Sequence, residues 1–264
     1  MIRFAFTAAL GGLLFGFDTA VISGTTEMIQ SVFRMTDAQL GWAVSSALVG
    51  CVVGAVGIGR PGDRYGRRNM LVVTAVLLFA SAVWTGAARS YTEFWMARVL
   101  GGFGVGGASV MAPMYIAEIA PARKRGRLVS TAQLAIVLGI VSAFFSNYLL
   151  AAIGDNSWRF MFWAEAIPAV VYFAMLFFVD ESPRWLVRVG RTEEALSVIR
   201  ETNPDEDSGQ VLDEIVESLA DEEASKHIRL FHMPYLRLVI IGMVVGVLNQ
   251  LTGINAIMYY APMI

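Results

Sequence analysis

Long apolar segments separated by polar links constrain this sequence more than any other feature. A membrane-spanning helix needs about 20 consecutive apolar residues, because a rise of about 1.5 Å per residue must cross a hydrocarbon core about 30 Å thick. With 56% hydrophobic residues, 16% charged residues and a mean hydropathy of +0.59, the chain lies outside the range of soluble domains. We therefore predict an all-α membrane protein with spans over residues 4–24, 40–59, 69–88, 92–118, 128–152 and 158–179, and a last span from about residue 236.

Polar residues between the sixth and the last span divide the chain into three parts. We expect residues 1–179 to form a six-helix transmembrane domain, 180–233 to form cytosolic linker helices, and 234–264 to begin a second transmembrane domain. Within the linker, helical patches are expected near 192–200 and 210–223. The net charge of −2 gives no indication of nucleic-acid binding, and a single cysteine excludes an internal disulfide or a cysteine-rich metal site. No nucleophile, base and metal ligands occur together, so the sequence favours a carrier over an enzyme and calls for no cofactor.

The distribution of Lys and Arg predicts the orientation in the membrane. Sixteen of the 20 Lys and Arg residues fall on one side if the N-terminus lies there, whereas Arg34, Arg89 and Arg159 fall on the other. Because cytoplasmic loops carry an excess of these residues, we expect a multi-pass protein of the plasma membrane, of the bacterial inner-membrane type, with a cytoplasmic N-terminus.

Three ionisable residues lie inside the predicted spans: Asp18, Arg98 and Glu165. Such a residue costs about 3 kcal/mol on insertion scales and suggests a function. Counting along the spans places Asp18 about 22 Å from the inner face and the other two residues about 10 Å below the outer face, which is one common layer. Opposite charges in one layer can pair, and a surplus carboxylate can hold a proton. Two interpretations stay open, a proton-coupling group and a purely structural ion pair.

The fourth span contains Gly102, Gly104 and Gly107 at the spacing of a dinucleotide-binding fingerprint. That motif requires a preceding strand and a strand-to-helix turn, which an apolar span does not provide. Small residues also let membrane helices approach closely. We therefore predict close helix packing here and at the glycine pairs 12/16 and 50/54.

Two charged clusters lie at the predicted cytosolic ends of the spans. The positive-inside rule explains the arginines of the loop over residues 59–68, but it does not explain the acid among them. An acid in such a loop can bind a helix N-terminus or a basic partner and so hold one state of a gate. We predict gate latches made by Asp63, Arg64, Arg67 and Arg68 in one cluster and by Glu118 and Arg125 in the other.

Six motifs together resemble a known family, the sugar porters of the major facilitator superfamily. This family includes bacterial xylose-proton symporters and facilitative glucose carriers. The motifs are FGFDTAVISG at 15–24, GRPGDRYGRR at 59–68, PMYIAEIAPARKRGR at 113–127, WRFMF at 158–162, ESPRWL at 181–186 and NQLTGINAIMYYAP at 249–262. The resemblance implies the N-terminal six-helix half of a major facilitator fold, followed by cytosolic helices and one helix of the second half. It also implies secondary transport of a pentose or hexose by alternating access.

The resemblance also assigns roles to residues. Asp18 stands where proton-coupled members carry an acid, which makes the xylose-proton symporter type the closest likeness, with the proton as coupling ion. The common depth of the three charges adds Arg98 and Glu165 to the predicted proton-coupling residues. Asn249 departs from the family pattern, which usually has Gln there, and its shorter side chain bears on the choice of sugar. The implied sugar-binding residues are Phe15, Gln133, Asn249, Gln250 and Asn255. The implied gating residues are Tyr259, Tyr260, Glu181 and Arg184.

Length is the main departure from the family. Its members have two halves of six spans each, and substrate binds between them. This sequence stops after the first helix of the second half, so we expect a partial chain whose missing half is supplied in cis or by another chain. The expected partners are a monosaccharide and the lipid bilayer. The alternatives are a facilitative sugar uniporter and a non-transporting sensor or scaffold; the amide side chains disfavour a drug exporter.

Overall fold

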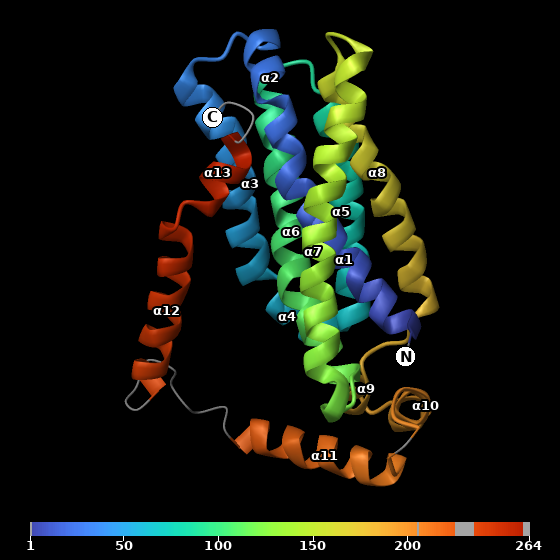
Figure 1. The fold of residues 1–264 in the computed structure, drawn as a ribbon. Helices are drawn as coiled ribbons and strands as arrows, with labels where there is room; N and C mark the ends of the chain where they lie inside the picture. Colours follow the sequence, from blue (N-terminus) through green and yellow to red (C-terminus); the bar gives the residue numbers. More distant parts are fainter. Residues whose placement is uncertain (1, 205, 225–234, 261–264) are drawn as a thin grey trace.

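The computed structural model describes residues 2–204, 206–224 and 235–260, and helices make up most of these residues. Figure 1 shows the long helices standing side by side in one bundle. These are α1 (Ile2–Val21), α3 (Asp37–Gly57), α5 (Arg67–Ala87), α6 (Tyr91–Ile119), α7 (Ala122–Leu150) and α8 (Ser157–Met175). Among the described residues, five segments are long and apolar enough to cross a membrane, namely α3, α5, α6, Gly126–Ile153 and Ser157–Phe178. The all-α membrane fold is therefore confirmed.

Short elements connect the long helices. One end of the bundle carries η1 (Ile22–Thr25), α2 (Thr26–Val32) and η2 (Ala151–Ile153), and the other carries α4 (Gly59–Tyr65) and η3 (Leu176–Phe178). The polar linker forms α9 (Pro183–Arg188), α10 (Thr192–Thr202) and α11 (Ser208–Ala224), which confirms its predicted helical patches. In Figure 1 these helices, α4 and the N-terminus lie at the same end of the bundle. The segments predicted to be cytosolic thus share one end.

Local chemistry explains where several of these helices begin. Thr36 and Gln39 form a reciprocal capping box at the start of α3. Ser182 caps α9, and Pro183 occupies its first turn, where a missing N–H costs nothing. Gly66, with φ +99°, makes the turn between α4 and α5. That conformation favours glycine, because it lies outside the regions that other residues readily adopt.

Close packing of α3 on α6 confirms the role predicted for the glycines. A Cβ atom on Gly102 would run into the Ala47 carbonyl of α3, and one on Gly50 would run into the Val99 carbonyl of α6. On another side of α6, a Cβ atom on Gly104 would lie 2.9 Å from Leu78 of α5. The glycines therefore let the α6 backbone pack directly against two neighbouring helices.

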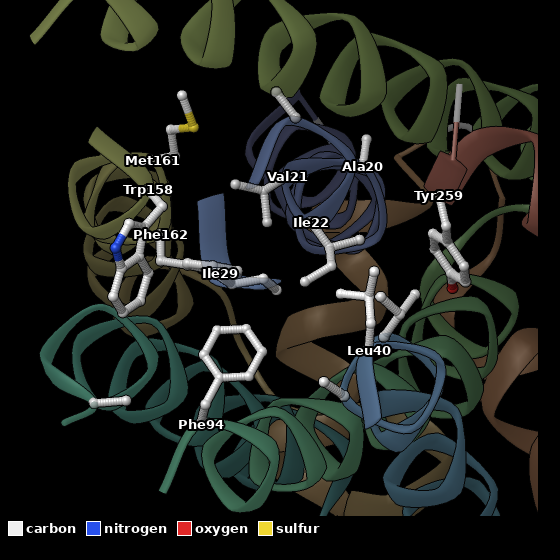
Figure 2. Packing of buried hydrophobic residues seen from close by; sticks show 14 of the residues in the cluster. Ala20, Val21, Ile22, Ile29, Leu40, Phe94, Trp158, Met161, Phe162 and Tyr259 are labelled. Carbon is white, nitrogen blue, oxygen red and sulfur yellow. The ribbon is translucent and has the colours of Figure 1, made fainter. Parts of the chain in front are cut away.

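The seventh apolar segment is broken, although the sequence predicted a single span. It forms α12 (Tyr235–Leu251) and α13 (Ile254–Tyr260), separated at Gly253, whose φ of +73° ends the first helix. In Figure 1, α12 stands apart from the bundle, whereas α13 lies against it near α3. Tyr259 of α13 belongs to the same buried cluster as Val21, Phe94 and Trp158. Figure 2 shows these side chains around the end of α1.

Candidate functional site

A buried ion pair links α1 and α6 in the interior of the bundle. Nη1 of Arg98 donates to Oδ1 of Asp18 at 2.6 Å, and Nη2 lies 3.4 Å from the main-chain oxygen of Asp18. The two residues are only 2% and 3% exposed. The pair that the sequence suggested is therefore present, and each charge has its partner where water is excluded.

Glu165 of α8 adds a second acid to this site. It is 1% exposed, its carboxyl group interacts with both Asp18 and Arg98, and among the described residues its Oε1 atom has no hydrogen-bond partner. The Arg98 guanidinium also lies over the Phe162 ring, 5.6 Å from its centroid. Asp18 therefore contacts the guanidinium directly, while Glu165 acts on it through its charge. Because an unpaired buried carboxylate is costly, the chemistry of this group of three residues suits the uptake and release of one proton.

Small residues make room for this site. A Cβ atom on Gly101 would lie 3.7 Å from Oδ1 of Asp18 and would run into Oγ of Ser81. Ser81 in turn donates to the Ala97 carbonyl at 2.8 Å, next to Arg98 in the chain. The glycine in α6 therefore allows Ser81 of α5 to pack beside the ion pair.

A cavity of about 220 Å³ opens beside the ion pair, between α1, α3, α6, α7 and the α12–α13 segment. Within the same cavity, Nδ2 of Asn255 donates to Oε1 of Gln250 at 2.9 Å. An amide carries both a donor and an acceptor, which suits a polyol, and an aromatic wall suits the carbon face of a sugar ring. The lining includes Phe15, Asp18, Arg98, Gln250, Asn255 and Tyr259.

Gln133 lies in a neighbouring cavity of about 190 Å³, between α1, α6 and α7. The two cavities share Phe15 and Ile136 in their walls. Tyr260 packs against the buried cluster that contains Tyr259. The side chains of Asn249 and Arg125 lie outside the described residues, so their predicted roles stay predictions.

Arg67 is the centre of a second charged cluster, at the end of the bundle that carries α4. Its Nε donates to both oxygens of Glu118 at 3.1 and 3.0 Å, and its Nη1 donates to the Gly62 carbonyl at 2.8 Å. Nη1 also lies 3.0 Å from Asp63, and the Arg67 side chain is only 4% exposed. Arg67 therefore joins α4, α5 and α6 through one guanidinium.

Glu181 binds the N-terminus of α5. Its Oε1 accepts hydrogen bonds from the backbone amides of Arg67 at 2.9 Å, Arg68 at 3.0 Å and Ser182 at 2.9 Å. Nε of Arg68 donates to the Leu176 carbonyl at 2.7 Å. A carboxylate at this position meets the positive end of the helix dipole and satisfies amides that have no partner within the helix.

Three further residues of this cluster were not identified in the sequence. Ser182 donates to Glu118, and Arg188 binds Asp63 at 2.9 Å and Glu222 at 2.7 Å. These residues come from segments far apart in the chain, which spacing alone cannot bring together. The one available signal was the repeat of Arg184 and Arg188 four residues apart, which places both on one face of α9.

Arg184 and Arg64 make different contacts. Arg184 binds Glu222 at 2.9 Å and Ser218 at 2.7 Å, both on α11, and so contributes to the cluster through the linker. Its hydrogen bond and that of Arg188 lower the pKa of Glu222, against the opposing effect of burial. The Arg64 guanidinium lies over the Tyr65 ring, 5.4 Å from its centroid.

Comparison with known proteins finds relatives along nearly the whole chain. Residues 4–264 match the family model of sugar (and other) transporters. The D-xylose-proton symporter of Escherichia coli K12 is 40% identical over 97% of this chain, and the glucose transport protein of a Synechocystis strain is 41% identical over 97%. The solved structure of the proton:xylose symporter XylE bound to 6-bromo-6-deoxy-D-glucose superposes with a TM-score of 0.89 at 38% identity, covering 99% of this chain.

The matches extend over only part of each relative. This chain spans 58% of the length of the E. coli and Synechocystis proteins and 61% of the XylE chain of known structure.

Proposed function

This chain belongs to the family of sugar (and other) transporters, and we propose that it acts in proton-coupled transport of a monosaccharide by alternating access. The E. coli relative is named a D-xylose-proton symporter, and other relatives are named arabinose-proton and galactose-proton symporters. A pentose or hexose is therefore the proposed substrate class, and the proton is the proposed coupling ion. In the proposed division, residues 1–179 form the transmembrane bundle, 180–233 the linker, and 234–264 the start of a second domain.

The observation that carries this proposal is the shared cavity. Asp18 and Arg98 line the same space as Gln250, Asn255 and Phe15, so a charge change at the pair acts directly on the sugar cavity. A proton on Asp18 removes the negative charge that holds the Arg98 guanidinium. In our proposal Glu165 exchanges this proton with Asp18, while the amides bind sugar hydroxyl groups.

Gating is proposed at both ends of the bundle. At one end the charged cluster around Arg67, Glu118 and Glu181 joins the membrane helices to α9, and it must separate if that end is to open. At the other end, α13 packs against η1, and its Tyr259 lines the cavity, so α13 is the proposed gate there. Alternating access then consists of opening one of these ends while the other stays closed.

A further set of helices is proposed as the partner, in cis or from another chain. Both Gln133 and Gln250 are exposed, although each lines a cavity within the bundle region. A sugar held from one side only would lose two or three hydrogen bonds of about 1 kcal/mol each, which weakens binding by more than tenfold. Without a second half there is also nothing against which the first can rock.

Reconstitution in liposomes tests this function. We would measure radiolabelled uptake of D-xylose and of a panel of pentoses and hexoses under an inward proton gradient. The chain would be reconstituted alone and together with the C-terminal part of the E. coli D-xylose-proton symporter. We expect saturable uptake that a protonophore abolishes, and only in the combined vesicles. Uptake by the chain alone would refute the need for a partner, and uptake insensitive to the protonophore would indicate a facilitative carrier.

An acid-to-amide substitution tests the role of the ion pair. Asp18→Asn should abolish accumulation against a gradient while preserving sugar exchange, because the amide cannot carry the coupling charge. Asp37→Asn is the matched control, since Asp37 is exposed and binds Gln30 at 2.9 Å, away from the cavity. Undiminished uphill uptake in Asp18→Asn would remove Asp18 from the mechanism and leave the ion pair as a structural feature.

A further inference from the structure

Asn147 of α7 binds the main chain at the end of α1. Its Nδ2 atom donates to the carbonyl of Val21 at 3.0 Å, across 126 residues of sequence, and the side chain is 6% exposed. Val21 is the last residue of α1, where the chain tightens into the 3₁₀ turn η1. The 3₁₀ turn that starts here ends the regular α-helical bonding of α1, and the Asn147 amide adds a side-chain hydrogen bond from α7 to the last residue of α1.

The backbone of η1 is shaped around this amide. A Cβ atom on Gly24 would run into Nδ2 of Asn147 and would lie 2.8 Å from its Cβ atom. Glycine is therefore needed at this position for η1 to lie against α7. The hydrogen bond and the glycine are independent features that produce the same contact.

Only the N–H group of the Asn147 amide makes a hydrogen bond that an apolar side chain of similar size could not make. Among the described residues, its Oδ1 atom is buried without a hydrogen-bond partner. A leucine of similar size would fill the same space without an unsatisfied oxygen, so packing alone does not favour an amide here. Donation to Val21 is the interaction that distinguishes Asn147 from an apolar residue.

The end of α1 and η1 also contact α13, the segment whose residues line the cavity. Helix α13 contacts both η1 and α1, and Tyr259 packs in the same cluster as Val21 and Ile22. Figure 2 shows Val21 and Ile22 between the Tyr259 ring and the aromatic side chains of α6 and α8. Thus η1 contacts both α7, whose Asn147 binds the end of α1, and α13.

We infer that Asn147 is a positioning residue that holds the end of α1 against α7, so that α13 can close on η1 and seal this end of the cavity. The inference rests on the proposed function, because alternating access gives this closure its purpose. Asp18 lies three residues before Val21 on the same helix. A shift of the α1 end therefore also reaches the ion pair.

Accessibility of the only cysteine measures this closure directly. Cys51 lines the cavity beside Asp18, and the chain has no other thiol. A membrane-impermeant thiosulfonate reagent would be applied to right-side-out and to inverted vesicles that contain the chain. Asn147→Leu removes the donor, and Gly24→Ala pushes the amide away from η1. Ser142→Ala is the control, because it removes only a 2.7 Å bond to Leu138 within α7.

In both test variants the reagent should label Cys51 faster than in the unmodified chain, and only when it is applied from the η1 side. We expect an increase of about fivefold, which corresponds to the loss of about 1 kcal/mol of closure. Ser142→Ala should match the unmodified chain. Equal increases from both sides would indicate general loosening and would overturn the inference, as would unchanged rates in both variants. Labelling needs no transport, so a chain that fails the uptake experiment still gives a decisive result here.

Discussion

Replacing Gly102 with alanine tests the physical basis of the bundle. A Cβ atom there would overlap the Ala47 main-chain oxygen, which cannot rotate away as a flexible side chain could. Overpacking of this kind costs about 1–3 kcal/mol. Alanine also favours the helical conformation over glycine by about 1 kcal/mol, which offsets part of that cost. The net effect of Gly102→Ala is therefore a destabilisation of up to about 2 kcal/mol.

Gly41→Ala separates these two contributions. Gly41 lies in α3, and nothing lies within 4 Å of a Cβ atom built there. This variant gains helix propensity without overlap, so it should be as stable as the unmodified chain or slightly more stable. The difference between the two alanine variants should be about 1–3 kcal/mol, which is the cost of overlap alone.

Unfolding in detergent, followed by tryptophan fluorescence against temperature or denaturant, measures this difference. Gly102→Ala should unfold at a clearly lower midpoint than Gly41→Ala, at equal detergent and protein concentration. Equal midpoints would mean that α3 and α6 move apart to accommodate the extra methyl group at no cost in stability. The close backbone contact would then contribute nothing to stability, and the glycine argument would be wrong.

Three further predictions address the charged end of the bundle. Arg67→Lys should lower the free energy of unfolding by about 1–3 kcal/mol, because one ammonium cannot reproduce the guanidinium contacts, whereas the exposed control Arg64→Lys should change it little. Arg184 and Arg188 lower the pKa of Glu222, so their contacts with it stabilise the linker at neutral pH and are lost only as the pH falls through that lowered pKa. The rate at which a protease cuts α11, measured against pH, should show this loss. The effect should be within about 1 kcal/mol, because the pairs are exposed. Ser208→Cys, in a chain without the native cysteine, should react with impermeant reagents only from the cytosolic side, and labelling from outside would refute the topology.

Hydropathy and charge were sufficient to predict the six long helices of the bundle and the pairing of Asp18 with Arg98. Asp18 and Arg98 are buried charges of opposite sign, and few arrangements satisfy both within one apolar layer. Depth follows from the rise per residue, which is nearly constant. This regularity made the contact predictable, although the sequence left its role open.

The direction in which a side chain points was harder to predict. Gln133 and Gln250 both match sugar-binding positions of the family, yet they line two different cavities. Which cavity a residue lines depends on the rotation of each helix about its axis, and the apolar spans give little indication of it because their outer faces meet lipid. The break at Gly253 was missed for a related reason, since a single glycine in an apolar run is common in membrane helices.

The contacts made by Glu118 show a further limit. The sequence pairs it with Arg125, whose side chain lies outside the described residues, and the structure shows two partners that the sequence did not suggest, Arg67 and Ser182. Both come from segments that spacing cannot place beside α6, and Arg188 and Asn147 were missed in the same way. Long-range polar contacts depend on how loops fold over the helix ends, which periodicity does not describe.

Helix α6 carries Arg98 of the buried ion pair and Glu118 of the cluster around Arg67. The structure of this helix therefore limits how a movement at one site can reach the other. Arg98 and Glu118 lie 20 residues apart on it, about 30 Å at the helical rise. From Gly101 to Gly107 the helix is fixed against α3 and α5 by direct backbone packing, so a displacement at Arg98 must move these helices together. Beyond that stretch, Pro113 lacks the N–H that would bond the carbonyl four residues earlier, which gives the helix a point at which it can bend. If Asp18 is the coupling group, the segment carrying Glu118 can respond only by moving with that rigid body or by bending at Pro113.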